Sequence, residues 1–121
     1  MRSTFPKREK LTSEKLIQEL FSKGSSFYSF PFKVISLPLP ESSASHQILF
    51  SVSKRTFKKA VDRNLIKRRM RESYRLNKNL LAQTPKRAIA YIYNAKEILT
   101  FAQIQERLIR TFNRFDHVEK I

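Results

Sequence analysis

The sequence predicts an α+β sandwich, in which helices cover a single sheet. Segments that alternate apolar and polar residues indicate half-buried strands, and segments with apolar residues every three to four positions indicate amphipathic helices. The strands flank one strongly basic helix, which makes a β-α-β unit. The 121 residues, 40% of them hydrophobic, suit one compact core without a second domain of ordinary size. We therefore expect one domain over residues 1–121, with the order α-β-β-α-β-α and a further strand if the first strand region splits.

The first helix is expected within residues 11–24. Thr12 or Ser13 can cap its N-terminus by accepting a backbone hydrogen bond. Gly24 is the single glycine of the sequence and stands where helices often end in a left-handed residue. One side of this helix is apolar and carries Leu16, Ile17, Leu20 and Phe21.

Two strands are expected before the basic helix, over residues 27–37 and 47–53. Pro31 favours an edge position or a bulge near the start of the first strand. One face of that strand carries Phe30, Phe32 and Val34. Its other face carries Lys33, Ile35 and Leu37. In the second strand, one face carries Ile48, Phe50 and Val52. The polar residues 38–46 between the two strands are expected to form a hairpin connection.

Three further elements complete the expected fold. Helical periodicity begins at about residue 59 in the basic segment, and residues 88–93 form a buried strand by their isoleucine and tyrosine content. Thr100 caps the last helix. The apolar positions of that helix recur at helical spacing and are Phe101, Ile104, Leu108, Phe112 and Phe115.

The charge balance points to a polyanionic partner, because 25 Lys and Arg stand against 10 Asp and Glu, for a net charge of +15. Nucleic acid is the first candidate and an anionic membrane surface the second. The absence of cysteine excludes a disulfide framework, a thiol nucleophile and a cysteine-ligated metal. No segment approaches the ~20 apolar residues of a membrane span, and the N-terminal residues lack the apolar run of a signal peptide. We expect a soluble, cytoplasmic protein.

The charge is concentrated in residues 54–75, which hold 10 of the 25 cations and only two acids, Asp62 and Glu72. On a helix with 3.6 residues per turn, six polar or cationic side chains share an arc of about 140°. We call this set the basic arc; it comprises Arg63, Asn64, Lys67, Arg68, Arg71 and Arg75. Within residues 60–75 of this helix arginine outnumbers lysine five to one, which favours forked contacts to phosphate oxygens.

The other side of the basic helix carries a narrow apolar seam, which is expected to dock on the sheet and consists of Ile66, Met70 and Tyr74. Val61 and Leu65 flank the far border of the arc, so packing is expected on both of its sides. A solvated basic face or a helix lying on a membrane would also be cationic. The net charge, the arginine bias and the opposing apolar seam disfavour a merely solvated face. The membrane is disfavoured because the seam is narrow and the strands need it for their core. Nucleic acid is therefore the favoured partner.

No catalytic or metal-binding residue is expected in this chain. A nuclease that worked alone would need metal-binding carboxylates or a positioned acid and base. The two acids of the basic helix point to different sides of it, and His46 falls in a polar loop without ligand-like spacing.

Three stretches together carry a specific resemblance: SVSKR at 51–55, KAVDRN at 59–64 and KRRMRESYR at 67–75. They resemble the signature of the protein subunit of bacterial ribonuclease P, and the other elements follow that family's order over nearly the whole chain. The resemblance implies a protein that assists an RNA subunit, which itself cleaves the 5′ leader from precursor tRNA. The implied cofactor is magnesium, bound mainly by that RNA. It also implies a left-handed β-α-β crossover, where the general rule predicts a right-handed one.

The resemblance also assigns residues. The basic helix contacts the catalytic RNA, and Lys54 and Arg55 lie at the start of the crossover near the same surface. The expected RNA-binding set is therefore Lys54, Arg55, Arg63, Asn64, Lys67, Arg68, Arg71 and Arg75. A cleft between the first helix and the sheet holds the single-stranded leader and is expected to be lined by Ile17, Phe21, Phe32 and Ile35. Phe32 and Ile35 lie on opposite faces of an ideal strand, so both can line it only if a bulge occurs near Pro31.

Some positions depart from the family's pattern: Leu65 replaces an arginine, Leu49 replaces a glycine, and Ile17 and Ile35 stand where aromatic residues are common. The expected partners are ribonuclease P RNA and precursor tRNA, with no membrane and no obligate protein partner. The alternative is a ribosomal-type RNA-binding module with no role in cleavage, which composition alone does not exclude. A DNA-binding helix is disfavoured because no helix-turn-helix pattern is present.

Overall fold

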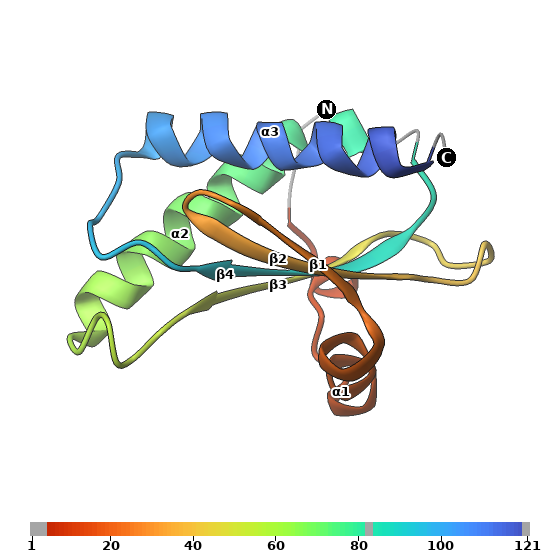
Figure 1. The fold of residues 1–121 in the computed structure, drawn as a ribbon, viewed down its shortest axis with the longest axis horizontal. Helices are drawn as coiled ribbons and strands as arrows, with labels where there is room; N and C mark the ends of the chain where they lie inside the picture. The colour runs from red at the N-terminus through yellow and green to blue at the C-terminus, as the bar shows by residue number, and fades with distance from the viewer. Residues whose placement is uncertain (1–4, 82–83, 120–121) are drawn as a thin grey trace.

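The computed structural model describes residues 5–81 and 84–119. Its elements are the 3-10 turn η1 (Lys7–Glu9), α1 (Glu14–Lys23), β1 (Ser25–Ser29), β2 (Phe32–Pro38), β3 (Gln47–Val52), α2 (Ala60–Asn77), the 3-10 turn η2 (Lys78–Leu81), β4 (Arg87–Tyr93) and α3 (Phe101–Glu119). Figure 1 shows three layers, with α3 and α2 on one side of the sheet and α1 on the other. The predicted α+β class is confirmed, and the first strand region is split in two.

The four strands form one sheet in the order β1-β2-β4-β3. β1 and β2 make an antiparallel hairpin, and the Phe30–Pro31 peptide bond at its turn is cis. β2 pairs with β4 antiparallel, and β3 pairs with β4 in parallel. The predicted hairpin between β2 and β3 is therefore wrong. β4 lies between them because nearly all of its side chains are buried on both faces, and such a strand belongs at the centre of a sheet.

The β3–α2–β4 connection joins two neighbouring parallel strands, as the predicted β-α-β unit requires. The left-handed sense of this crossover stays a prediction from the family resemblance. No helix among the residues that the structure describes is both long and apolar enough to cross a bilayer.

The larger core fills the space between the sheet and the two long helices. Side chains from β2 and β4, such as Val34 and Tyr91, meet the apolar seam of α2, whose residues are fully or almost fully buried, as predicted. α3 contributes four of its five predicted apolar residues, Ile104, Leu108, Phe112 and Phe115, whereas Phe101 in its first turn is only partly buried. Its N-terminus is capped by Thr100, which accepts from the Gln103 N–H (3.2 Å) and donates its own backbone N–H to Gln103 Oε1 (3.0 Å).

A smaller core lies between α1 and the side of the sheet that faces away from α2 and α3. We call this side of the sheet the α1 face. It is built from Leu11, Leu20, Ile35, Ala88 and Ala90. α1 begins where the Leu16 N–H donates to Ser13 Oγ (3.3 Å), so Ser13 is the capping residue.

Gly24 follows α1, but the prediction that it would be left-handed is wrong. Its φ and ψ are −69° and 153°, which is extended backbone that any residue adopts. The constraint at this position is steric instead. A Cβ atom here would lie 2.4 Å from the Leu20 carbonyl oxygen and 2.8 Å from Ile35 Cγ2. Glycine therefore allows the end of α1 to approach β2 closely.

His46 is buried rather than part of a solvated loop. Its Nδ1 accepts from the Arg87 N–H (3.0 Å), so its Nε2 carries the proton and donates to the Leu81 carbonyl (3.0 Å). The ring thus ties the loop before β3 to the start of β4 and to η2. Burial lowers the pKa of His46 below its ordinary value.

Candidate RNA-binding surfaces

The basic arc of α2 faces outward because the seam on the opposite side is anchored in the core. Ile66 and Met70 have no exposed surface, whereas Asn64, Arg68 and Arg71 are exposed. Arg63, Lys67 and Arg75 are partly buried. The structure thus brings the six predicted residues together on one side of the helix.

Arg63 connects the arc to the loop before α2. Its Nη1 donates to the Phe57 carbonyl (2.7 Å) and to the Lys58 carbonyl (2.9 Å). Phe57 is itself buried in the larger core. Lys54 and Arg55 lie in this same loop with exposed side chains. Arg63 therefore holds the loop cations close to the start of the basic arc.

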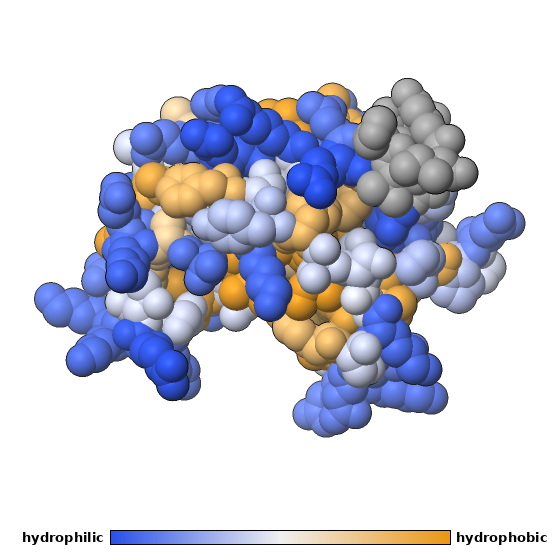
Figure 2. All heavy atoms as spheres, in the orientation of Figure 1, coloured by the Kyte–Doolittle hydropathy of each residue, from blue (hydrophilic) through white to orange (hydrophobic). Residues whose placement is uncertain are grey.

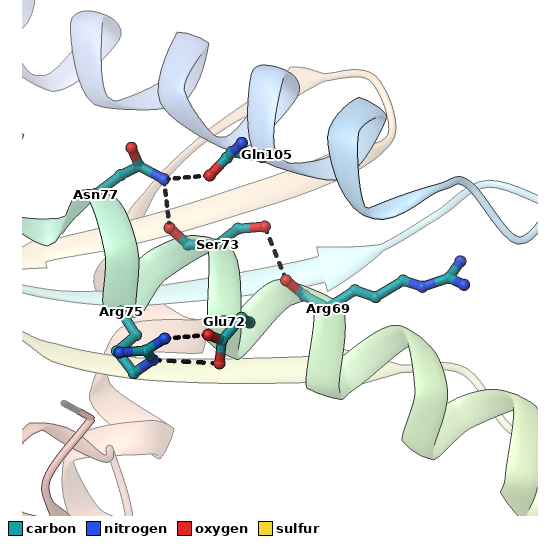
Figure 3. Close-up of polar contacts among 6 residues, drawn as sticks. All are labelled: Arg69, Glu72, Ser73, Arg75, Asn77 and Gln105. Carbon is teal, nitrogen blue, oxygen red and sulfur yellow. Dashed lines mark hydrogen bonds and ion pairs between the residues drawn. The ribbon is translucent and has the colours of Figure 1, made fainter. Parts of the chain in front are cut away.

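Arg75 differs from the other members because it forms a two-pronged ion pair with Glu72, seen in Figure 3. The hydrogen bonds from Arg75 lower the pKa of the Glu72 carboxyl. A carboxylate so close offsets part of the positive charge of Arg75. We therefore expect Arg75 to attract a phosphate less strongly than Arg68 does.

Arg69 lies outside the predicted arc and contacts another element. Its Nη1 donates to the Leu99 carbonyl (2.5 Å), which ties α2 to the loop before α3. Further along the same side, the Ser73 hydroxyl donates to the Arg69 carbonyl (2.8 Å), and Asn77 Nδ2 donates to Gln105 Oε1 of α3 (2.9 Å) (Figure 3). These polar contacts fix the orientation in which α2 presents its arc.

Two surface hollows adjoin the arc. One, of about 610 Å³, is lined by Val61, Asn64, Leu65, Arg68 and Arg71, and we call it the α2 hollow. The other, of about 160 Å³, is where Arg71 meets the N-terminal segment and β3, and it includes Lys10 and Leu49. The cationic surface therefore continues from α2 to Lys10, which the sequence analysis did not include.

The prediction that packing borders the arc on its far side is wrong for Val61, which is 77% exposed. In Figure 1, α2 begins beyond the ends of β3 and β4. Val61 lies in its first turn and so has no sheet to pack against. Leu65, one turn later, is only partly buried.

The predicted leader cleft is only partly assembled as expected. Phe21 is 49% exposed, Ile17 is partly buried, and Ile35 is 6% exposed beneath α1 in the smaller core. Phe32 does not line this cleft, because it is fully buried on the other face, with its ring 5.6 Å from that of Tyr91. The physical reason is that β2 pairs with β4 without a bulge from Phe32 to Pro38, so positions 32 and 35 point to opposite faces.

Residues 5–116 match the family model described as Ribonuclease P. The chain belongs to the ribonuclease P protein family. It is 32% identical to the ribonuclease P protein component of Porphyromonas gingivalis, over 89% of this chain and 83% of that one. It is 34% identical to that of Citrifermentans bemidjiense, over 93% and 92% of the two chains.

Solved structures of ribonuclease P proteins share the fold. The protein from Staphylococcus aureus superposes with a TM-score of 0.69 at 27% identity, covering 93% of this chain and 96% of that one. The protein from Thermotoga maritima gives 0.72 at 26% identity, covering 88% and 96%. This chain is therefore a subunit of ribonuclease P, the ribonucleoprotein endoribonuclease of tRNA 5′ maturation. The alternative of a ribosomal-type module without a role in cleavage is set aside.

Tyr28 and Lys33 of this ribonuclease P protein also lie on the α1 face, although neither was predicted as a site residue. In the β1–β2 hairpin Tyr28 pairs with Lys33 and Ser26 pairs with Ile35, so all four share that face. Tyr28 is 53% exposed and Lys33 is exposed. Positions 17 and 35 are isoleucine, so the aromatic ring on the sheet here is that of Tyr28 on β1. Placing the hairpin turn at Pro31 in the sequence would have revealed this pairing.

The molecule is hollowed on the side that carries α1. Figure 2 shows a notch beneath the sheet, between a hydrophilic lobe formed by α1 and a second one at the start of α2, with hydrophobic surface between them. In the part of the chain that the structure describes, no three His, Asp or Glu side chains gather closely enough to hold a metal ion.

Proposed function

We propose that this ribonuclease P protein binds the catalytic RNA through the basic arc of α2 and holds the 5′ leader of precursor tRNA on the α1 face. One observation carries the proposal: Asn64, Arg68 and Arg71 are exposed on α2, whereas Ile66 and Met70 on its other side are fully buried in the core. The arc is therefore presented to a partner by a rigid support, rather than being one side of a mobile charged helix.

The chemistry of the arc fits an RNA backbone. Guanidinium groups donate two parallel hydrogen bonds to phosphate oxygens, and each phosphate neutralised releases counterions, which favours binding at low salt. Lys54 and Arg55 extend the cationic surface through the loop that Arg63 holds. Asn64 adds a neutral donor and acceptor within this surface.

The α1 face fits a single strand. Exposed rings of Phe21 and Tyr28 offer platforms for unstacked bases, and Lys33 offers a cation for a phosphate. Partly buried Ile17 supplies apolar surface beside them, and Ile35 supports it from within the smaller core. In this proposal magnesium is held mainly by the RNA subunit, which carries out the cleavage in the cytoplasm, and the chain positions the substrate.

Reconstitution tests the proposal. The purified chain, combined with a bacterial ribonuclease P RNA, is expected to restore leader cleavage at magnesium concentrations too low for the RNA alone. Arg68→Ala should weaken this rescue. Arg110→Ala is the matched control, because it removes an exposed arginine from α3 that pairs with Glu106 (2.7 Å). A chain that neither binds the RNA nor lowers its magnesium requirement would refute the proposal.

A further inference from the structure

The α2 hollow combines apolar and polar groups in an unusual way for a phosphate-binding surface. Its volume of about 610 Å³ lies within the range of about 300–1,000 Å³ typical of small-ligand sites. Val61 is an apolar side chain at 77% exposure, and Leu65 lies beside it. A single exposed apolar residue is common on protein surfaces, but here exposed Val61 and partly buried Leu65 together border a cationic arc, which needs a further reason.

The helical spacing places these side chains next to one another. Asn64 and Leu65 are three and four residues after Val61, and Arg68 is three or four residues after those two, so all four project from neighbouring positions of one face. Arg71 continues this face by a further turn. Arg63, in contrast, directs Nη1 to the Phe57 and Lys58 carbonyls, outside the set that lines the hollow.

A phosphate group alone does not match this arrangement. Arg68 and Arg71 would attract it, but contact with Val61 and Leu65 would remove water from the phosphate without returning a hydrogen bond. A nucleobase has two apolar faces and a polar edge, and proteins recognise unstacked bases in RNA by contacting both. The side-chain amide of Asn64 can donate and accept at once, as the edge of a base requires.

We infer that the α2 hollow receives an unstacked nucleobase of the RNA subunit. Val61 and Leu65 pack against its face, Asn64 hydrogen-bonds its edge, and Arg68 and Arg71 contact the flanking phosphates. The inference rests on the proposed function, because it requires α2 to bind the RNA subunit.

Salt dependence separates base contacts from phosphate contacts. Val61→Ala removes exposed apolar atoms and raises helix propensity, so the fold is retained. We expect it to weaken binding of the full chain to ribonuclease P RNA roughly three- to tenfold. The loss should be equal at every salt concentration, because no ionic contact is removed. Arg68→Ala should instead reduce the slope of log K against log salt by roughly 0.7 to 0.9. Leu80→Ala, which shortens an exposed apolar side chain outside the hollow, should change neither quantity.

Chemical footprinting identifies the base. Dimethyl sulfate and kethoxal report on base edges, whereas hydroxyl radicals report on riboses. The bound wild-type chain should shield the edge of an unpaired nucleotide. The double variant Val61→Ala, Leu65→Ala should lose this shielding and keep the ribose protection around it.

Three outcomes would contradict the proposed contact. Wild-type affinity of Val61→Ala at all salt concentrations, or ribose protection with no shielded base edge, would overturn the inference while leaving RNA binding by α2 intact. A wild-type slope and affinity for Arg68→Ala would overturn the proposed function of α2, and the inference with it.

Discussion

Phe32 and Ile35 lie three residues apart on β2, yet their side chains enter different cores on opposite sides of the sheet. Only Ile35 can therefore contribute to a surface beside α1. The exposed aromatic ring on that face belongs to Tyr28, whose strand pairs with β2. Substitutions of Phe21 and Tyr28 should therefore weaken binding of the leader, whereas substitution of Phe32 should reduce only the stability of the fold.

Phe21→Ala is expected to weaken the binding of precursor tRNA by the reconstituted enzyme. Losing one base contact should cost about 1–3 kcal/mol, and mature tRNA, which has no leader, should be unaffected. Phe32→Ala is the matched comparison: it should lower the free energy of unfolding by about 3–5 kcal/mol, because it empties part of the core. The affinity ratio of precursor to mature tRNA, measured with the melting temperature, checks both. Equal losses for the two RNAs with Phe21→Ala would contradict the leader contact.

Tyr28→Trp would report on the leader directly, because the sequence contains no tryptophan. Stacking of a base on the introduced indole should change its fluorescence when precursor tRNA binds. The change should increase with leader length and be absent with mature tRNA. Ile98→Trp places the same probe at another exposed position, in the loop before α3, and should respond equally to both RNAs. A Tyr28→Trp signal independent of the leader would refute this role.

Arg68→Ala and Arg75→Ala should differ in their salt dependence, although both remove one charge from the arc. Arg68 is exposed, whereas Arg75 is engaged by the Glu72 carboxylate. Removing Arg75 also releases Glu72, so the double variant Arg75→Ala, Glu72→Ala controls for the new negative charge. We expect the slope of log K against log salt to fall by roughly 0.7 to 0.9 for Arg68→Ala and by less for the double variant. Identical slopes would show that the ion pair opens when RNA binds.

Stability should fall as the pH drops below about 6.5, the ordinary pKa of histidine. Burial lowers the pKa of His46 in the folded state, so the unfolded chain takes up a proton first as the solution is acidified. The stability that neutral His46 contributes is fully present above the pKa that this residue has in the unfolded chain. It is lost as the pH falls through the lower pKa that His46 has in the folded protein. Urea denaturation of the wild type and His46→Gln across pH 5 to 8 measures it. The difference between their free energies of unfolding should shrink towards acid pH, and a constant difference would contradict this account.

Gly24→Ala should destabilise the fold by about 1–3 kcal/mol, as overpacking does. The backbone at Gly24 is extended and accepts any residue, but the new Cβ would crowd the Leu20 carbonyl and Ile35. Ser22→Ala, at an exposed position near the end of α1, should have little effect. Thermal unfolding of both variants checks this. A neutral Gly24→Ala would mean that α1 can move away from β2 at no cost.

The sequence by itself determined the features that depend on local periodicity. The side chains of a helix repeat every 3.6 residues whatever surrounds it. For this reason the buried seam and the basic arc of α2, most of the apolar face of α3 and the Thr100 cap could be predicted, and the cap of α1 could be narrowed to Thr12 or Ser13. The motif in residues 51–75 also carried the family resemblance. The concentration of positive charge on α2 predicted a nucleic-acid partner, and the motif specified ribonuclease P RNA.

Only the tertiary structure decided which residues from different strands share a face. Strand order and register are set by pairing between distant segments, and no local pattern showed that β4 separates β2 from β3. The hairpin turn at Pro31 brings Tyr28 to the face of Ile35, and the unbroken pairing of β2 with β4 puts Phe32 on the other face. The exposure of Val61 likewise follows from where α2 begins relative to the sheet. Apart from the local turn at Pro31, these features depend on how distant segments pack, which the periodicity of a single segment does not encode.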